Sequence, residues 1–399
     1  MDSGPVLPTP LLQNGDLNFA AKRSLLLRLI RAVQPIARTE IAERLKIDKS
    51  TVSENVKPLV ARGILREETM STGEPGRRPR VLSFTDDGYF IGVNIGVRHS
   101  QIGVSRLNGE VSDEDEFSTP PDVEHAIRRV QEKIESIKRA HPGQTLRMLG
   151  VSVPGMADPA RRSMVFAPNL GWRNIPFADR LQRVADAQVV VENDSTAAAM
   201  FESRLKLRET ADGNTSNFIL VRSGTGIGVG MVIGGEVYRG TGAGLGMAGE
   251  FGHMTIVAGG KACVCGNRGC WERYASAASA ASLYLGDRPL RPGETPPRFV
   301  EIVAKAENGD TRSRRTLEKI GDYLGIGIAN VIMGTGIPRV IISGRLVYGW
   351  QFIVGPLHDA IRRSIIGNMK GWEVEPGSPS GSALGGALEV AVEEYLATV

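Results

Sequence analysis

The chain has 399 residues, of which 41% are apolar and 23% charged, a balance typical of a folded globular protein rather than a disordered or fibrous one. Its longest uncharged apolar stretch, 323–338, contains four glycines and is shorter than the roughly 20 residues that a membrane-spanning helix needs. The first ten residues lack the basic and apolar runs of a signal peptide, so we expect a cytoplasmic protein with no membrane partner.

The net charge of +4 is unevenly distributed along the chain. Residues 20–80 contain 14 Lys and Arg against 7 Asp and Glu, a balance of +7, which leaves −3 for the remainder. A basic segment attached to an acidic body is typical of a protein with one end facing phosphates.

The basic segment follows a Pro-rich arm and has the pattern of a winged helix-turn-helix. We predict helices over 21–33, 40–46 and 50–62, and then a basic hairpin over 64–84 that forms the wing. The third helix is expected to expose side chains that suit phosphates and base edges, and the wing adds arginines. The candidate DNA-contacting residues are Lys49, Ser50, Thr51, Ser53, Asn55, Lys57, Arg77, Arg78 and Arg80. The alternative is a three-helix cap whose basic residues only keep it soluble.

Two later segments, 89–110 and 217–236, share one pattern. Each contains an apolar strand, a Gly-bearing turn, a second apolar strand and a Gly-Glu turn. Such a repeat predicts a duplicated lobe with a cleft between the two copies. The strands and helices that alternate around these hairpins predict an α/β core.

All three cysteines lie within eight consecutive positions. Cys263, Cys265 and Cys270 follow His253 in a Gly-rich stretch. One imidazole and three thiolates satisfy tetrahedral zinc without an open position, which predicts a structural metal site. The alternative is three buried free thiols.

Polar side chains gather around this loop and at one strand end. Asn193 and Asp194 follow a predicted strand over 188–192, at the edge of an α/β sheet where ligands bind. The spacing equally allows Asp194 to be no more than the N-cap of the next helix. Glu250, His253 and Glu272 flank the cysteines, and carboxylates with an amide suit a polyhydroxylated ligand. The alternative for these carboxylates is a set of surface groups on mobile loops.

The stretch from Gly260 to Glu272, with its three cysteines and the preceding Glu250-x-Gly-His253, resembles the signature of the ROK family (repressors, uncharacterised open reading frames and sugar kinases). The resemblance covers essentially the whole chain. It implies an α/β fold class, in which an N-terminal winged helix-turn-helix precedes a two-lobed actin-like ATPase (ribonuclease H-like) sugar-kinase fold with a zinc loop.

The resemblance also implies roles for single residues. The implied zinc ligands are His253, Cys263, Cys265 and Cys270, and the implied sugar-binding residues are Asn193, Asp194, Glu250, His253 and Glu272. In the kinase members, the residue matching Asp194 is the general base that takes a proton from the attacking sugar hydroxyl.

One motif departs from the kinase pattern. The first phosphate loop of such kinases has the sequence Asp-x-Gly-x-Thr, whereas this chain has Asn94-Ile-Gly96-Val-Arg98. The change removes a carboxylate expected to help hold Mg²⁺ and a hydroxyl near the phosphates, so we expect no catalytic residues and no enzyme activity. The degenerate nucleotide site comprises Asn94, Gly96, Arg98, Gly224, Thr225, Gly226 and Gly228.

We expect three regions along the chain. These are an arm with the winged helix-turn-helix over 1–85, a small α/β lobe over 86–195 completed by the C-terminal helix 384–399, and a large α/β lobe over 196–383 with the zinc loop.

The first functional hypothesis is a nucleoid-associated repressor of sugar-metabolism genes. Its partners are operator DNA and a monosaccharide or derivative as inducer, and it acts as a homodimer or higher homo-oligomer. The alternatives are an ATP-dependent sugar kinase that also binds DNA, and a constitutive DNA-binding protein with a vestigial sugar cleft.

Overall fold

The computed structural model describes residues 19–70, 80–85, 88–209, 217–240, 248–286, 288–290 and 293–399. Among these residues the chain forms two compact units: unit 1 comprises 217–231 and 238–382, and unit 2 comprises 19–209, 232–237 and 383–399. The lobe boundary therefore lies beyond residue 209 rather than at 195, because helix α6 (Asp194–Glu209) packs with the strand that precedes it. The N-terminal arm over 1–18 lies outside the described residues.

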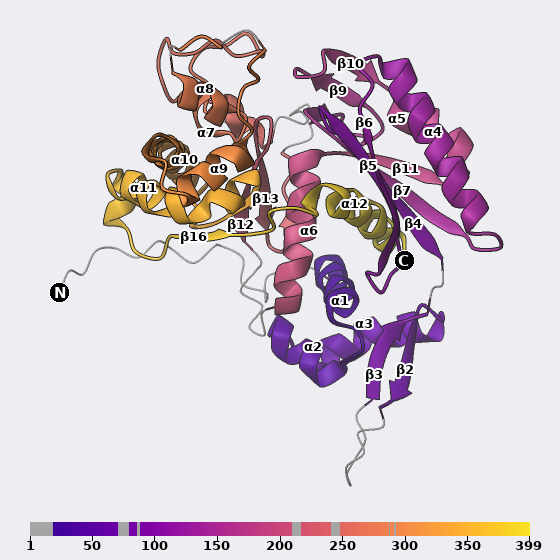
Figure 1. Ribbon diagram of the computed structural model, residues 1–399. Coiled ribbons are helices and arrows are strands. Elements are labelled where there is room, and N and C mark those ends of the chain that lie inside the picture. Colours follow the sequence, from indigo (N-terminus) through magenta and orange to yellow (C-terminus); the bar gives the residue numbers. More distant parts are fainter. Residues whose placement is uncertain are drawn as a thin grey trace. The chain divides into compact units, whose positions relative to one another are not determined.

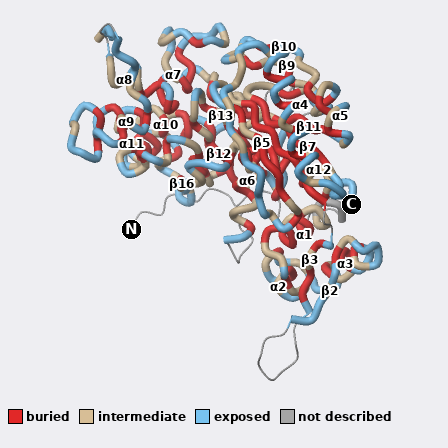
Figure 2. The backbone as a smooth tube through the Cα atoms, turned by 45° about the vertical axis from the view of Figure 1, so that its right-hand side comes forward, coloured by how far each residue is buried: buried red, intermediate tan, exposed pale blue. Residues whose placement is uncertain are grey.

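The first part of unit 2 is a three-helix module with a small sheet. Its helices are α1 (Phe19–Val33), α2 (Arg38–Leu45) and α3 (Lys49–Ala61), and its strands are β1 (Ile36–Ala37), β2 (Leu65–Thr69) and β3 (Arg80–Phe84), in the order β1-β3-β2. Buried side chains at helical spacing line all three helices (Figure 2). The three predicted helices are confirmed to within two residues. The tip between β2 and β3, with Arg77 and Arg78, lies outside the described residues.

A five-stranded mixed sheet forms the centre of unit 2 (Figure 1). Its order is β11-β7-β4-β5-β6, made of β4 (Tyr89–Asn94), β5 (His99–Ser105), β6 (Val111–Ser118), β7 (Leu146–Val153) and β11 (Gln188–Asn193). Strands β4, β7 and β11 are parallel, so their carboxyl ends share one edge. A smaller sheet has the order β10-β9-β8, made of β8 (Met156–Ala157), β9 (Met164–Ala167) and β10 (Trp172–Ile175).

Helices cover both faces of the central sheet. Successive side chains of a strand point to opposite faces, so each strand contributes to both cores. Ile91 and Val93 belong to the core that includes the inner faces of α4 (Val123–Ala140) and α5 (Phe177–Ala185). Phe90, one residue before Ile91, points to the other face and belongs to the core formed with α6 and α12 (Ser382–Thr398).

Unit 1 is built on a second sheet of the same design. Its strands β12 (Phe218–Ser223), β13 (Ile227–Ile233), β15 (Arg339–Gly344) and β16 (Glu373–Pro376) run in the order β13-β12-β15-β16, and β13 continues into a hairpin with β14 (Glu236–Val237). The helices are α7 (Glu272–Ala275), α8 (Ser279–Leu285), α9 (Phe299–Glu307), α10 (Thr311–Thr335) and α11 (Trp350–Arg362), with 3₁₀ turns η2 (Glu250–His253), η3 (Arg345–Gly349) and η4 (Ile365–Asn368). Among the described residues, every helix of the chain is too short or too polar to span a lipid bilayer.

Candidate functional site

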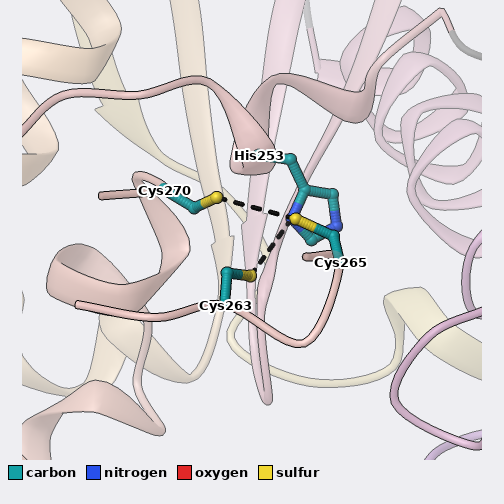
Figure 3. A group of neighbouring side chains, drawn as sticks. All are labelled: His253, Cys263, Cys265 and Cys270. Carbon is teal, nitrogen blue, oxygen red and sulfur yellow. Dashed lines mark hydrogen bonds between the residues drawn. The ribbon is translucent and has the colours of Figure 1, made fainter. Parts of the chain in front are cut away.

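Four side chains in unit 1 form a cluster that could hold a metal ion (Figure 3). They are His253, Cys263, Cys265 and Cys270, and their ligand atoms all lie within 4.8 Å of one another. Cys265 Sγ is 3.7 Å from Cys270 Sγ, and Cys263 Sγ is 3.6 Å from His253 Nδ1. A tetrahedron with Zn–S bonds of about 2.3 Å has edges of about 3.8 Å, so the spacing fits tetrahedral zinc.

The backbone of the loop brings the ligands together over a short stretch of sequence. Cys263 N–H donates to Asn267 O at 2.9 Å, and Gly266 N–H donates back to Cys263 O at 3.1 Å, which closes a tight turn. Gly269 has a φ of +79°, and a Cβ there would lie 1.8 Å from Val257 O. Only glycine fits this left-handed, crowded position. The turn thereby places Cys263, Cys265 and Cys270 on one side of the loop.

The protonation of the cluster depends on whether a cation is bound. Burial raises the pKa of the Cys263 thiol, and the neighbouring Glu272 raises it further; burial likewise raises the pKa of Cys270. Glu272 Oε1 lies 3.2 Å from Cys263 Sγ and 3.6 Å from His253 Nδ1. Without a cation these shifts keep the thiols protonated. A bound cation would stabilise them as thiolates beside the buried carboxylate.

Two carboxylates lie against this cluster. Glu250 Oε2 is 3.7 Å from His253 Nε2, so the histidine ring points one nitrogen at the cysteines and the other at Glu250. Glu272 is 7% exposed and stands at the start of α7, and a Cβ on Gly226 would lie 2.3 Å from its Oε2. The structure thus brings together Glu250, His253 and Glu272 with the glycine turn after β12.

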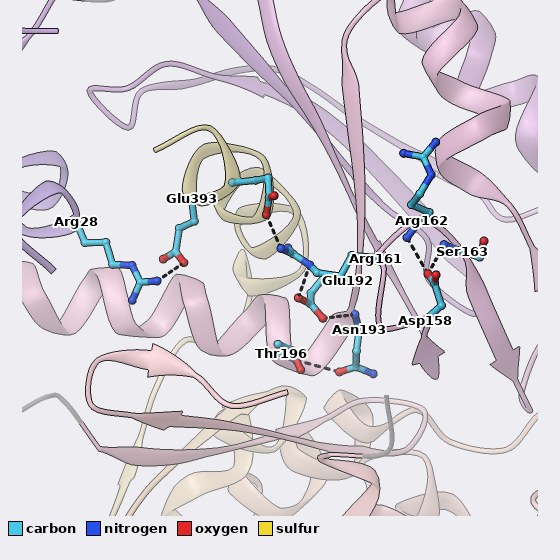
Figure 4. A network of polar contacts seen from close by, with 10 residues as sticks. Arg28, Asp158, Arg161, Arg162, Ser163, Glu192, Asn193, Thr196 and Glu393 are labelled. Carbon is cyan, nitrogen blue, oxygen red and sulfur yellow. Dashed lines mark hydrogen bonds and ion pairs between the residues drawn. The ribbon is translucent and has the colours of Figure 1, made fainter. Parts of the chain in front are cut away.

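In unit 2, Asn193 ends β11 and Asp194 begins α6. Asn193 Oδ1 accepts from Ser195 N–H at 2.9 Å and from Thr196 N–H at 3.0 Å, so Asn193 is the N-cap of α6 (Figure 4). Its Nδ2 donates to Gly155 O at 2.8 Å. The sequence left open whether Asp194 is the cap, and the structure gives that role to the preceding residue.

The altered phosphate loop lies between β4 and β5. Asn94 is 5% exposed, and its Oδ1 accepts from Ser152 Oγ at 2.9 Å, so an uncharged amide stands at the end of β4. Arg98 is exposed. The second turn, between β12 and β13, is closed by Gly224 N–H donating to Gly226 O at 3.0 Å, and Thr225 at its tip is exposed.

Helix α3 presents most, but not all, of the side chains expected on its outer face. Lys49, Ser50 and Lys57 are exposed and Thr51 and Ser53 are half-buried. The expectation for Asn55 is wrong. It is 2% exposed, and its Nδ2 donates to Thr51 O at 2.8 Å, because it shares the inner helix face with Val52 and Leu59.

The family model of the ROK family matches residues 90–389. The xylose repressor of Bacillus subtilis (strain 168) is 30% identical over 96% of this chain and 98% of its own length. The chain belongs to the ROK family.

Solved ROK structures share the fold. A ROK family transcriptional regulator, a homologue of the Escherichia coli MLC protein, superposes with a TM-score of 0.73 at 21% identity over 95% of this chain and 97% of its own. A ROK glucokinase from Streptomyces griseus, solved with glucose and AMPPNP, superposes with a TM-score of 0.64 at 26% identity, over 76% of this chain and 99% of its own. The actin-like sugar-kinase fold implied by the ROK signature is therefore confirmed.

One polar network of this ROK chain was not predicted from any sequence pattern. Arg161 Nε lies 3.3 Å from Glu192 Oε2, and Glu192 Oε1 accepts from Asn193 N–H at 3.0 Å (Figure 4). Arg161 also pairs with Glu394 of α12, 233 residues away in the chain. No local motif contains these three groups, so only the fold shows that they support the strand end at Asn193.

Proposed function

We propose that this protein is a sugar-responsive transcriptional repressor. The observation that carries the proposal is the extent of the similarity: the B. subtilis xylose repressor aligns over 96% of the chain, whereas the S. griseus glucokinase aligns over 76% of it and 99% of itself. The part of this chain that the kinase does not match is about as long as the N-terminal module, which precedes the start of the family match at residue 90. A basic helical module added to a kinase-like body is the composition of a regulator.

The N-terminal module is proposed to be a winged helix that binds operator DNA as part of a homodimer. Helix α3 would enter the major groove with Lys49, Ser50, Thr51, Ser53 and Lys57, and Arg80 with the arginines at 77 and 78 would contact the adjoining backbone or minor groove. Asn55 is left out of this set because it is buried.

The sugar is proposed to contact Asn193 and Asp194 of unit 2 and Glu250, His253 and Glu272 of unit 1. Zinc on His253 and the three cysteines would fix the flanking carboxylates, and His253 Nε2, which faces Glu250, stays on the side away from the cysteines. D-xylose is the first sugar to test, because the aligned B. subtilis relative is named a xylose repressor.

A sugar kinase is the second candidate, since the glycine turn 224–228 and Asp194 are both present. The neutral Asn94 opposes it, because phosphoryl transfer depends on Mg²⁺ and positioned negative charge. Steady ADP production from Mg-ATP with D-xylose or D-glucose would favour the kinase over the repressor.

The proposal is tested with DNA selected by the protein itself from a random-sequence duplex pool. The affinity for the selected fragment is then measured with and without D-xylose, D-glucose and N-acetylglucosamine, and the same sugars are screened by thermal shift. We expect one sugar to raise the melting temperature and to change the DNA affinity by about tenfold. Failure to select any DNA sequence, or an affinity that no sugar changes, would contradict the repressor.

A further inference from the structure

Helix α1 of the DNA-binding module shares a hydrophobic core with two helices of the unit 2 body. Leu26 and Ile30 of α1, Met200 of α6 and Val392 of α12 are all at most 1% exposed and belong to the same cluster. The module and the body are therefore packed together through α6 and α12, without a solvated linker at this point.

Helix α6 begins at the residues proposed to bind sugar and runs towards the module. Asp194 starts the helix, and Arg204 lies ten residues further on, which is about 15 Å along the axis. Helix α12 crosses close to its first turns: a Cβ on Gly386 would lie 2.7 Å from Ala197 C and 2.9 Å from Ala198 N. The two backbones are in contact, so α12 cannot stay still if the start of α6 shifts.

A buried charge cluster joins these helices to α1. Glu389 of α12 is 1% exposed; its Oε2 accepts from Arg31 of α1, and its Oε1 accepts from Arg204 of α6 at 2.7 Å. Burial alone would raise the pKa of Glu389, but the charges of the two arginines outweigh it and the pKa is lowered, so the carboxylate is ionised. One side chain from each helix thus meets in the interior.

The cluster is incompletely satisfied. Two guanidinium groups share a single carboxylate, and Arg31 Nε, Arg31 Nη2 and Arg204 Nε are buried with no hydrogen-bond partner among the described residues. Buried donors without acceptors are rare in folded proteins. Glu389 consequently has two competing partners, and a small displacement of α6 changes how its charge is divided between Arg204 and Arg31.

A second set of contacts leads from the sugar-binding edge to the same helix. Asn193 N–H donates to Glu192, which pairs with Arg161, which pairs with Glu394 of α12 (Figure 4). One residue earlier on α12, Glu393 Oε2 lies 3.0 Å from Arg28 Nη2 of α1. The chain of polar contacts therefore runs from Asn193 to the DNA-binding module through adjacent residues of α12.

We propose that α6 and α12 couple the sugar-binding residues Asn193 and Asp194 to helix α1, and that the Arg31–Glu389–Arg204 cluster is the contact through which sugar binding repositions the DNA-binding module. The proposal rests on the proposed function, because it assigns a route to that regulation. Sugar binding at the start of α6 shifts the helix, Arg204 draws Glu389 away from Arg31, and α1 is released from its fixed position on the body.

The decisive test replaces the whole cluster with apolar side chains of similar volume, Arg31→Met with Glu389→Leu and Arg204→Met. Buried ion clusters often tolerate such replacement without loss of folding. We expect the triple variant to bind the selected operator fragment and to be stabilised by D-xylose like the unmodified protein, but the sugar should change its operator affinity by less than about twofold. A sugar response equal to that of the unmodified protein would overturn the proposal.

A hydrogen-exchange experiment tests the same link without sugar or DNA. Glu389→Gln removes the shared charge, and we expect amides of α1 and of residues 195–200 of α6 to exchange about tenfold faster than in the unmodified protein. The matched control is Glu124→Gln, which removes a carboxylate from an exposed pair with Arg180 on the other face of the sheet and should alter neither segment. Faster exchange confined to α1 would overturn the coupling.

The operator-binding and hydrogen-exchange experiments together distinguish failure of this inference from failure of the proposed function. If D-xylose has no effect on operator binding by the unmodified protein, the proposed function fails for that sugar, while the exchange comparison still decides whether Glu389 links α1 to the start of α6. If the sugar acts on the unmodified protein and equally on the triple variant, the repressor stands and the coupling route is wrong.

Discussion

The cysteine loop of unit 1 (253–270) and the junction of α1, α6 and α12 in unit 2 both bring charged and polar side chains together, by opposite means. The cysteine loop places four possible metal ligands within 18 consecutive residues, from His253 to Cys270. The junction uses side chains far apart in sequence, such as Arg31 and Glu389, which are 358 residues apart. The side chains of the loop are close together in sequence. Those of the junction come together only when unit 2 folds.

The difference has an energetic consequence. A metal ion bound by the loop would give it rigidity that its sparse apolar content cannot supply. The junction obtains its rigidity from packed helices and from charges that must be matched inside the protein. We therefore expect the loop to lose its metal and its structure together when one ligand is removed. The junction should instead lose stability in graded steps.

The largest effect is expected from Cys270→Ser. Cys270 is fully buried, and a serine hydroxyl is a poor zinc ligand, so the variant should lose its metal. Structural zinc in small peptides contributes about 10–16 kcal/mol of apparent binding free energy, and a loss of several kcal/mol of unfolding free energy is expected here. Zinc content by atomic absorption and calorimetric unfolding measure both effects.

Val264→Ser is the matched control for the cysteine variant. Val264 lies in the same loop, between two proposed ligands, but is 58% exposed. We expect one zinc per chain and an unfolding free energy within about 0.5 kcal/mol of the unmodified protein. A Cys270→Ser protein that retained zinc and stability would show that the cysteines are buried thiols rather than ligands.

The next largest effect is expected at the junction from Glu389→Gln. The amide leaves Arg31 and Arg204 buried without a countercharge, and breaking a buried ion pair in this way typically costs about 3–5 kcal/mol. Urea unfolding of the two proteins at pH 7 measures the difference. A change below about 1 kcal/mol would mean that the cluster behaves like a surface ion pair.

The same variant has a defined pH dependence. Because the arginines lower the pKa of folded Glu389 below its ordinary value of 4.5, the unfolded state binds the proton more tightly. The stabilisation from this carboxylate is therefore complete above the unfolded pKa and is lost as the pH falls through the folded pKa. The gap in unfolding free energy between the unmodified protein and Glu389→Gln should be constant above about pH 5.5 and shrink below about pH 4.5. A gap that widened in acid would contradict the ion pairing.

How far the sequence predicts each region follows from this comparison. The clustering of His253 with the three cysteines and the two glycine hairpins were predictable because each lies within a short stretch of sequence. Asn55 was predicted wrongly, because its polarity favoured the outer face although it follows Val52 by three residues on the apolar face. The choice between Asn193 and Asp194 as N-cap depends on a one-residue shift in the helix start, which propensity does not resolve. The Arg31–Glu389 contact has no sequence signal, because nothing local pairs residues from opposite ends of the chain.

A smaller effect is expected where α12 meets the backbone of α6. In Gly386→Ala, the new Cβ would lie 2.7–2.9 Å from the backbone of Ala197 and Ala198, so the helices must separate. Overpacking of this kind typically costs about 1–3 kcal/mol. The control is Gly334→Ala in α10, which is exposed and where the added methyl meets no described heavy atom within 4 Å outside its own helical turn. There the better helix propensity of alanine should stabilise the protein by up to about 1 kcal/mol. Equal effects of the two changes would show that α6 and α12 are not in close contact.

The smallest effect is expected from the cap of α6, and it separates two roles of Asn193: capping the helix and the proposed contact with sugar. Asn193→Ala removes the acceptor for Ser195 and Thr196 N–H, and loss of an N-cap typically costs about 1 kcal/mol. Asn193→Ser keeps a capping oxygen and should recover most of that loss, although it lacks the amide that donates to Gly155 O.

Thermal unfolding without sugar measures the cap, and unfolding with D-xylose measures the ligand contact. If Asn193 only caps, the serine variant regains both stability and the sugar-induced shift. If its amide also contacts the sugar, stability returns while the shift stays reduced, because the shorter serine hydroxyl cannot replace the Nδ2 amide donor.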